Sequence, residues 1–278
     1  MLENAVEELD KRCEEANPAR DGDYIGEDGL LYCATCHTRK THRITVNGAL
    51  VIVHCNCFCQ AKKYDEEMQG IRKETADIRM HEIRRECFDS PAMCYSRFSD
   101  KETDQNTKIC RSYAKSFDKM LNMGEGLLLC GDQGTGKTYN ACQIANYLLD
   151  HGYSCRVITA ARVLAELSGS FDKAEILDKY CAKDLLVIDD FGADRDSAYS
   201  QEQMFTLLDQ RISSGKPLII TTNFNLENFK KPRTPLESRM NDRILEKCYP
   251  IQYIGSSKRM DNLRKNYNKI DEILKEEK

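Results

Sequence analysis

The amino-acid sequence predicts an α/β fold built on a parallel sheet with helices on both faces. From residue 91 onward, apolar segments of strand length alternate with segments of helical periodicity. The strand segments, among them "GLLLC", "LLVID" and "LIITT", are apolar almost throughout instead of alternating, which is typical of parallel strands buried on both faces. Glycine-rich or acidic residues follow these strands directly, at the sheet edge where such folds bind ligands.

The sequence before residue 91 predicts three smaller parts. Residues 1–23 form a charged segment, and residues 24–60 are rich in Cys, Gly and β-branched residues. Within the second part, Asn47-Gly48 separates two alternating apolar runs, a strong signal for a tight hairpin. Residues 61–90 predict a partly solvated connector helix with a narrow apolar stripe, formed by Tyr64, Met68, Ile71 and Ile78. Residues 91–278 then form the α/β domain.

Composition and charge favour a cytoplasmic protein without a membrane partner. The net charge of −4 gives no global attraction for nucleic acid, so any such contact must come from local basic patches. The acidic N-terminus lacks the apolar core of a signal peptide, and no apolar run approaches the about 18 residues that span a bilayer. Of the 14 cysteines, five fall between Cys33 and Cys59. In a reducing compartment such a cluster indicates metal ligands rather than disulfides.

A phosphate-binding loop is the most specific motif in the chain. The segment "GDQGTGKT", residues 131–138, matches G-x-x-x-x-G-K-[ST], follows a predicted strand and opens a predicted helix. In such a loop the backbone N–H groups surround the phosphates, Lys137 reaches the β- and γ-phosphates, and Thr138 ligates Mg²⁺. A glycine-rich turn without a ligand is the alternative. The predicted nucleotide-binding residues here are Gly131, Asp132, Gln133, Gly134, Thr135, Gly136, Lys137, Thr138 and Tyr139.

Polar residues at two further strand ends complete the predicted site. Asp189 and Asp190 end a buried strand, so we expect Asp189 to hold Mg²⁺ through water and Asp190 to polarise an attacking water. Asn223 ends another strand and can hydrogen-bond that water or the γ-phosphate. Taken alone, the acids can cap a turn and Asn223 can be a turn former.

The clustered cysteines predict a zinc-ribbon-like module. Cys33 and Cys36 form a C-x₂-C pair, and the predicted hairpin brings a second group of cysteines back towards them. Two members of the second group complete the four ligands, and His37 or His54 can substitute. Two alternatives remain. The cysteines can form no metal site, or Cys33 and Cys36 can form a redox pair, although no thioredoxin-like context surrounds them. The candidates for the second group are Cys55, Cys57 and Cys59.

Together these motifs resemble the AAA+ ATPases, and within them the bacterial and phage helicase loaders of the DnaC/DnaI type. The resemblance covers about residues 88–262. It implies that "GDQGTGKT" is Walker A, "LLVIDDFG" is Walker B and "TTN" is sensor 1. It also implies a P-loop NTPase fold with a reduced helical lid, because few residues follow the last strand. A reduced lid leaves the nucleotide more exposed, so the resemblance implies weak intrinsic ATPase activity that DNA or a partner stimulates. Asp190 stands where many AAA+ proteins have Glu, and its shorter side chain is expected to slow hydrolysis, although the loader branch often has Asp there.

The resemblance also implies roles for arginines near the C-terminus. In "SRMNDRILEK", residues 238–247, Arg243 matches the finger that enters a neighbouring subunit's ATP site, with Arg239 supporting it. The alternative is that both form surface ion pairs with nearby acids, Glu237, Asp242 or Glu246. Arg259, in "GSSKR", resembles a sensor 2 residue or starts an ordinary basic helix.

The function implied by the resemblance is ATP-dependent loading of a DnaB-type helicase onto single-stranded DNA by a homo-oligomer that uses ATP, Mg²⁺ and Zn²⁺. An extra helical segment at residues 161–181 corresponds to the family's strand-binding insertion. Basic residues in or beside it are a candidate DNA surface: Arg156, Arg162, Lys173, Lys179 and Lys183. Three alternatives stay open: a transposition helper ATPase of the IstB type, a small-molecule kinase, and a zinc-based binding module with an inactive ATPase.

Overall fold

The structure is a computed structural model, and it describes residues 8, 10–12, 14–15, 18–46, 48–101, 104–192, 197–258, 263 and 267 of the 278-residue chain. The chain divides into two compact units, Met1–Met80 and His81–Lys278. None of the helices within the described residues is long and apolar enough to cross a membrane.

The first unit contains two small antiparallel ribbons and most of one long helix. Strand β1 (Tyr24–Ile25) pairs with β2 (Leu31–Tyr32), and β3 (Thr41–Val46) pairs with β4 (Ala49–His54). The second ribbon runs in register from Thr41↔His54 to Val46↔Ala49, which confirms the predicted hairpin. Of the two predicted turn residues, Asn47 lies outside the described residues, and Gly48 has a φ of 84° that suits glycine in a tight turn.

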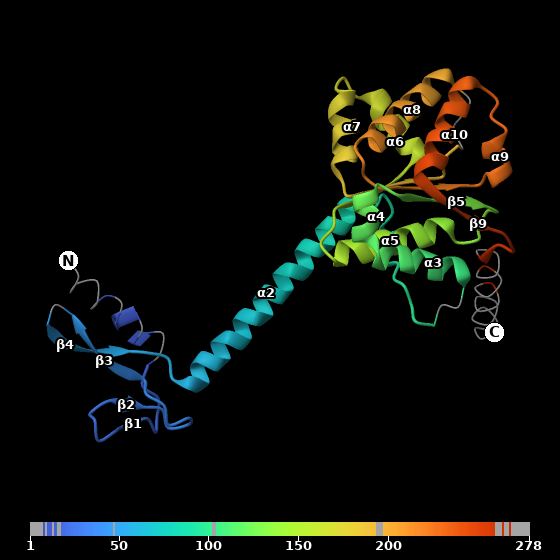
Figure 1. Ribbon diagram of the computed structural model, residues 1–278. Helices are drawn as coiled ribbons and strands as arrows, with labels where there is room; N and C mark the ends of the chain where they lie inside the picture. Colours follow the sequence, from blue (N-terminus) through green and yellow to red (C-terminus); the bar gives the residue numbers. More distant parts are fainter. Residues whose placement is uncertain are drawn as a thin grey trace, which may run out of the picture. The chain divides into compact units, whose positions relative to one another are not determined.

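Helix α2 (Phe58–Cys87) is a single unbroken helix of 30 residues (Figure 1). It begins and ends slightly before the predicted range of 61–90. Its C-terminal limit follows from Pro91, because the residue before a proline is pushed out of the helical region. Ser90 has the expected extended backbone, with φ −109° and ψ 123°.

The second unit is built on a five-stranded parallel sheet, which confirms the predicted fold class. The strand order is β6-β7-β8-β5-β9, and every neighbouring pair is parallel. All residues of the three central strands are buried, as expected for a sheet covered on both faces. The strands are β5 (Gly126–Gly131), β6 (Cys155–Thr159), β7 (Leu185–Asp189), β8 (Leu218–Thr222) and β9 (Cys248–Tyr253).

Helices cover both faces of this sheet (Figure 1). One face carries α3 (Gln105–Lys115), α4 (Phe117–Met123) and α5 (Lys137–Asp150). The other face carries α6 (Ala160–Gly169), α7 (Lys173–Ala182), α8 (Ala198–Ser213) and α10 (Pro235–Lys247), whose apolar side chains form one core with β5, β7 and β8. The described part of the unit also contains two short helices, η1 (Pro91–Tyr95) and α9 (Leu226–Lys230).

Candidate nucleotide site and metal centre

Three strand ends meet at one edge of the sheet. Strands β7, β8 and β5 are consecutive and parallel, with Ile188 opposite Ile220 and Cys130 opposite Thr222. Their carboxyl ends therefore present Asp189, Asn223 and the phosphate loop side by side, as the sequence predicted. This edge is where open α/β folds bind ligands.

The phosphate loop links β5 to the N-terminus of α5 in a conformation that needs glycine. Gly131, Gly134 and Gly136 have φ values of 124°, 79° and 105°, a region that side chains disfavour. A Cβ atom at Gly131 would lie 2.2 Å from the carbonyl oxygen of Tyr253. The helix begins at Lys137, so the N–H groups of its first turn face the loop as an anion-binding site.

Lys137 is held over this loop. Its side chain is buried, and its ammonium donates hydrogen bonds to the carbonyl oxygens of Gly131 at 2.9 Å and Asp132 at 2.6 Å. Burial lowers its pKa, and the carboxylates of Asp190, Asp132 and Asp189 oppose that shift. The cation is thus placed at the helix N-terminus, where phosphate oxygens bind.

Asp189 lies at the centre of a buried hydrogen-bond cluster. Its Oδ1 accepts hydrogen bonds from the Thr138 hydroxyl at 2.8 Å and from the Thr221 hydroxyl at 2.5 Å. Burial raises the pKa of this carboxyl, and the two hydroxyl donors oppose that shift. The two predicted Mg²⁺ ligands, Thr138 and Asp189, are therefore in direct contact. A hydroxyl beside a carboxylate suits Mg²⁺, which prefers oxygen ligands and retains several waters.

The Thr221 hydroxyl also fixes the position of Asp190. It accepts a hydrogen bond from the N–H of Asp190 at 3.0 Å, and Asp190 has a φ of 52°. A positive φ is uncommon for a non-glycine residue and clusters at functional sites. Asp190 and Asn223 are both exposed at the sheet edge. Thr221 was not among the predicted residues.

The segment after β9 closes over the loop from the other side. The N–H of Gly255 donates to Asp132 Oδ2 at 3.2 Å, and the N–H of Lys258 donates to the carbonyl oxygen of Gly134 at 3.0 Å. The start of the predicted sensor 2 segment is thus in contact with the phosphate loop. Arg259 itself lies outside the described residues, as does most of the chain after it on which the predicted lid depends.

The two predicted arginines of α10, Arg239 and Arg243, are exposed, and each contacts side chains of its own chain. Arg243 forms ion pairs with Asp209 at 3.3 Å and Glu246 at 3.7 Å. Arg239 stacks over the Phe205 ring, with 4.8 Å from its Cζ to the ring centroid. Glu246 is one of the surface partners that the sequence suggested, whereas Asp209 is not. Exposed pairs of this kind are weak, so they do not fix Arg243 in place.

The basic residues of the predicted DNA surface differ in their surroundings. Arg156 donates to the carbonyl oxygens of Glu86 and Cys87 and pairs with Asp89 at 2.7 Å, so its guanidinium has a structural role. Arg162 pairs with Glu166 one helical turn away. Lys173 lies over the Tyr199 ring. Helices α6 and α7 confirm that residues 161–181 form two helical pieces.

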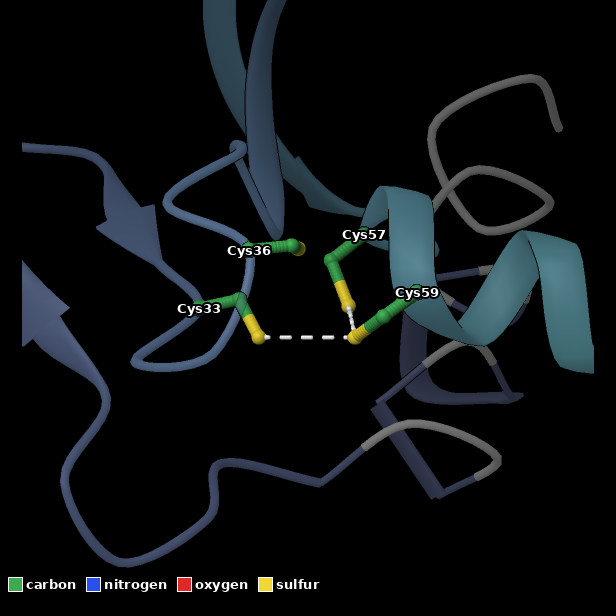
Figure 2. Close-up of side chains that lie close together, drawn as sticks. All are labelled: Cys33, Cys36, Cys57 and Cys59. Carbon is green, nitrogen blue, oxygen red and sulfur yellow. Dashed lines mark hydrogen bonds between the residues drawn. The ribbon is translucent and has the colours of Figure 1, made fainter.

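Four cysteine thiols of the first unit converge (Figure 2). Cys33, Cys36, Cys57 and Cys59 have sulfur atoms that all lie within 4.8 Å of one another. The separations are 3.7 Å from Cys33 to Cys59 and 3.3 Å from Cys57 to Cys59. Four sulfurs about 2.3 Å from a tetrahedral zinc ion are about 3.8 Å apart, so this donor set fits zinc.

The remaining candidate ligands point elsewhere. The thiol of Cys55 donates to the carbonyl oxygen of Arg39 at 3.6 Å. His54 hydrogen-bonds Asp10, and His37 hydrogen-bonds the hydroxyl of Tyr24. The structure therefore selects Cys57 and Cys59 from the three candidates of the second group.

The surroundings shift the pKa values of Cys33, Cys36 and Cys59 in different directions. The Thr38 hydroxyl, followed by the N–H of Cys59, lowers the pKa of Cys36 to about 5. The N–H of Cys36 lowers the pKa of Cys33. The hydrogen bond with the Cys57 sulfur, followed by burial, raises the pKa of Cys59 to about 12, because both favour the protonated thiol. A divalent cation at the centre would favour the thiolate form of these ligands, since metal-bound thiols are deprotonated.

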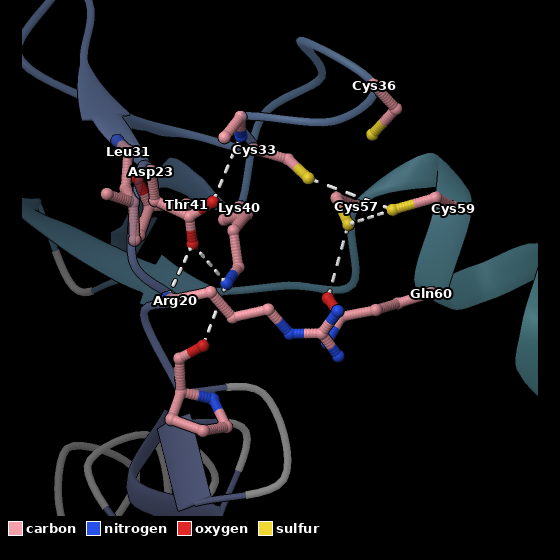
Figure 3. A network of polar contacts seen from close by, with 12 residues as sticks. Arg20, Asp23, Leu31, Cys33, Cys36, Lys40, Thr41, Cys57, Cys59 and Gln60 are labelled. Atoms are coloured by element: carbon pink, nitrogen blue, oxygen red, sulfur yellow. Dashed lines mark hydrogen bonds and ion pairs between the residues drawn. The ribbon is translucent and has the colours of Figure 1, made fainter.

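A buried ion pair supports the first cysteine pair (Figure 3). The ammonium of Lys40 donates to Asp23 Oδ2 at 2.7 Å and to the carbonyl oxygen of Pro18 at 2.8 Å, and both charged side chains are almost fully buried. Asp23 Oδ1 accepts a hydrogen bond from the N–H of Ala34, which lies between Cys33 and Cys36. Sequence reasoning missed this pair, because nothing in the sequence links residues so far apart.

The site agrees with what comparison with known proteins finds. The IstB-like ATP binding protein family matches residues 89–266, more than half of the chain. The chain belongs to this family. A putative ATP-binding protein in an insertion sequence of Mycobacterium tuberculosis is 27% identical over 209 residues, covering 73% of this chain and 80% of that protein.

Helicase loaders are also similar to this chain. The replicative helicase loader DnaC of Escherichia coli is 32% identical over 139 residues, which cover 48% of this chain and 54% of DnaC, so the match spans about half of each. The crystal structure of DnaI matches with a TM-score of 0.53 and 26% identity, over 61% of this chain and 94% of that one. The second unit is accordingly an AAA+ ATPase domain of the DnaC/IstB type.

Proposed function

We propose that this protein is an ATP-dependent loader that places a DnaB-type replicative helicase on single-stranded DNA in the cytoplasm. The observation that carries the proposal is the combination of a DnaC-like ATPase site with a four-cysteine module in a separate unit. Residues 1–88 lie outside the region that the ATPase family shares. A closed set of four sulfur ligands leaves no open position for catalysis, so this module acts as a structural platform for docking the helicase.

The ATPase site works through positioning and charge. Lys137 and the first turn of α5 bind the phosphates of ATP, while Thr138 and Asp189 hold the Mg²⁺ that neutralises them. Asp190 and Asn223 orient the attacking water at the ends of β7 and β8. Thr221 acts as a positioning residue, because its hydroxyl contacts both Asp189 and the backbone of Asp190.

Turnover requires an assembled protein. Arg243 lies exposed on α10 and is free to exchange two weak surface ion pairs for the γ-phosphate of a neighbouring subunit. In this proposal ATP is an assembly ligand: it stabilises the arrangement of subunits in which Arg243 contacts it. A single subunit then hydrolyses ATP only weakly, and the assembly with single-stranded DNA or helicase does so faster.

A transposition helper ATPase is the second candidate. The family match itself and the insertion-sequence relative from Mycobacterium tuberculosis favour it, and the latter covers more of the chain than DnaC does. Such a protein would use the same ATPase site with a transposase as its partner. The two candidates therefore differ in the protein bound by the first unit.

Co-purification distinguishes the two candidates. The full chain, with zinc, is incubated with a DnaB-type helicase or with an IS21-type transposase, each in ATP, in ADP and without nucleotide. The loader proposal expects capture of the helicase in ATP, loss of capture in Cys57→Ser, and unchanged capture in Cys55→Ser, whose thiol lies outside the cluster. Capture of the transposase alone would overturn the loader proposal in favour of the helper ATPase.

A further inference from the structure

The middle of α2 carries an apolar stripe on an otherwise charged helix. Tyr64, Ile71 and Ile78 are exposed over 58%, 55% and 57% of their surfaces. Cys87 is the sole buried residue of the helix. Most of the stability of a protein helix comes from packing an apolar face against other elements. A solvated helix of 30 residues therefore lacks the packing that normally holds such an element.

The stripe has the spacing of a coiled-coil seam. Along α2, apolar or small residues recur at alternating intervals of three and four: Ala61, Tyr64, Met68, Ile71, Thr75 and Ile78. In heptad terms Ala61, Met68 and Thr75 occupy a positions, and Tyr64, Ile71 and Ile78 occupy d positions. A straight α-helix repeats every 3.6 residues, so a stripe with this seven-residue period suits packing against another helix rather than a globular core.

Thr75 is the one polar residue in this seam, and its polar group is already satisfied. Its hydroxyl donates a hydrogen bond to the carbonyl oxygen of Ile71 at 2.8 Å. Burial between two helices would therefore leave no unpaired donor at Thr75 and would present its methyl group to the partner.

The charges that flank the seam identify the partner and its direction. Glu67 and Glu74 occupy g positions, and Arg72 and Arg79 occupy e positions. In a parallel, in-register pair each g residue lies beside the e residue that is five positions later in the other helix. Glu67 then meets Arg72 of the second copy, and Glu74 meets Arg79 of the second copy. An antiparallel pair would instead place acid against acid and arginine against arginine.

These charges are not committed elsewhere in the part of the chain that the structure describes. Glu67 has one exposed contact at 3.8 Å with Lys63, a turn away on the same helix. No ion pair there involves Arg72, Glu74 or Arg79. Pairing of these residues with a second chain would therefore break no strong contact within the first chain.

We propose that α2 forms a parallel, in-register coiled coil with α2 of a second copy of this chain. The seam runs from Ala61 to Ile78, inside the first unit. It is an association surface independent of the nucleotide site, and it holds two four-cysteine modules side by side with the same orientation. The proposal does not rest on the helicase or transposase assignment.

Charge reversal in the full-length, zinc-loaded protein tests the pairing without nucleotide, so that ATP-driven assembly does not contribute. Self-association is measured by sedimentation equilibrium over a range of concentrations. Glu67→Arg/Glu74→Arg and Arg72→Glu/Arg79→Glu each turn four interchain contacts of a symmetric pair from attractive to repulsive, and each should weaken association by about 100-fold. The variant with all four changes restores every parallel pair and should associate like the wild type.

A matched control carries the same change of charge away from the seam. Glu66→Arg/Asp77→Arg reverses two acids of α2 at f and c positions and should leave association unchanged. Nucleotide binding confirms that each variant is folded. The proposal is overturned if the wild type stays monomeric throughout, if either double variant associates as the wild type does, or if the fourfold variant fails to recover.

Discussion

Arg243→Ala is the most informative single substitution in the ATPase domain. In the folded chain the Arg243 side chain is 47% exposed, and its guanidinium contacts Asp209 and Glu246 at 3.3 and 3.7 Å. Exposed ion pairs of this kind stabilise a protein by about 0–1 kcal/mol. We therefore expect the free energy of unfolding of the variant to lie within about 1 kcal/mol of that of the wild type. A dilute, single subunit of the variant should bind ATP with unchanged affinity, because Lys137 and the loop are intact.

The expected effect on turnover is far larger. An arginine that reaches the γ-phosphoryl group from another subunit contributes about 10³–10⁵ to kcat, which corresponds to about 4–7 kcal/mol of transition-state stabilisation. The steady-state ATPase rate of the assembled protein should therefore fall by at least about 10³-fold. Lys247→Ala is the matched control, because it removes a partly exposed cation from the same helix, where Lys247 contacts Glu125 at 3.7 Å.

Mixing two inactive variants shows whether the arginine acts between subunits. Lys137→Ala removes the phosphate-binding cation and keeps Arg243, whereas Arg243→Ala keeps the phosphate loop. In an equal mixture, roughly a quarter of the interfaces pair an intact loop with an intact arginine, so turnover should recover to about that fraction. Normal turnover of Arg243→Ala alone, or no recovery in the mixture, would refute the shared site.

The other predictions concern the buried carboxylate and the cysteine cluster. Thr221→Val removes one hydroxyl donor to Asp189 and should lower the free energy of unfolding by about 1.5–3 kcal/mol at pH 8, measured by urea denaturation without Mg²⁺. Burial raises the pKa of Asp189 above its usual 3.8, so the contribution of this carboxyl to stability falls as pH rises through the folded pKa. Loss of the Thr221 donor raises the folded pKa further. The difference in unfolding free energy between the variant and the wild type should therefore shrink near pH 4, where the carboxyl takes up a proton. An equal deficit at both pH values would contradict this assignment. Cys57→Ser should lose its zinc during equilibrium dialysis, whereas Cys55→Ser should keep one zinc ion per chain. Equal zinc contents in the two variants would contradict the assignment of Cys33, Cys36, Cys57 and Cys59 as the ligands. Chelation of zinc should raise protease sensitivity within residues 24–60 and leave the melting of the ATPase domain unchanged; a single joint transition would show that the two parts are coupled.

The phosphate loop was predictable because all its requirements are local. Its glycines, Lys137 and Thr138 are contiguous, and a strand before it and a helix after it can be recognised from hydropathy alone. Asp189 and Asn223 followed from the rule that the carboxyl ends of parallel strands share one edge. Neither prediction required the strand order, which the structure supplies.

Features that depend on distant partners were not predictable. The choice of Cys57 over Cys55 depends on where β4 ends and α2 begins, and adjacent cysteines in "HCNCFC" look equivalent in sequence. Thr221 was missed because a threonine in a buried strand is ordinary. Its role depends on the pairing of β8 with β7, which brings its hydroxyl to Asp189. For the same reason, Asp209 was not foreseen as a partner of Arg243, because it comes from α8.

The most direct test of the account is helicase loading on closed circular single-stranded DNA, which a ring can enter only if it is opened. A DnaB-type helicase, the circle coated with single-strand-binding protein, and an annealed labelled oligonucleotide are incubated with ATP and either the wild-type chain or Lys137→Ala. The account predicts rapid displacement of the oligonucleotide with the wild type and only the helicase's own slow background with the variant. Equal displacement with the two proteins would contradict it.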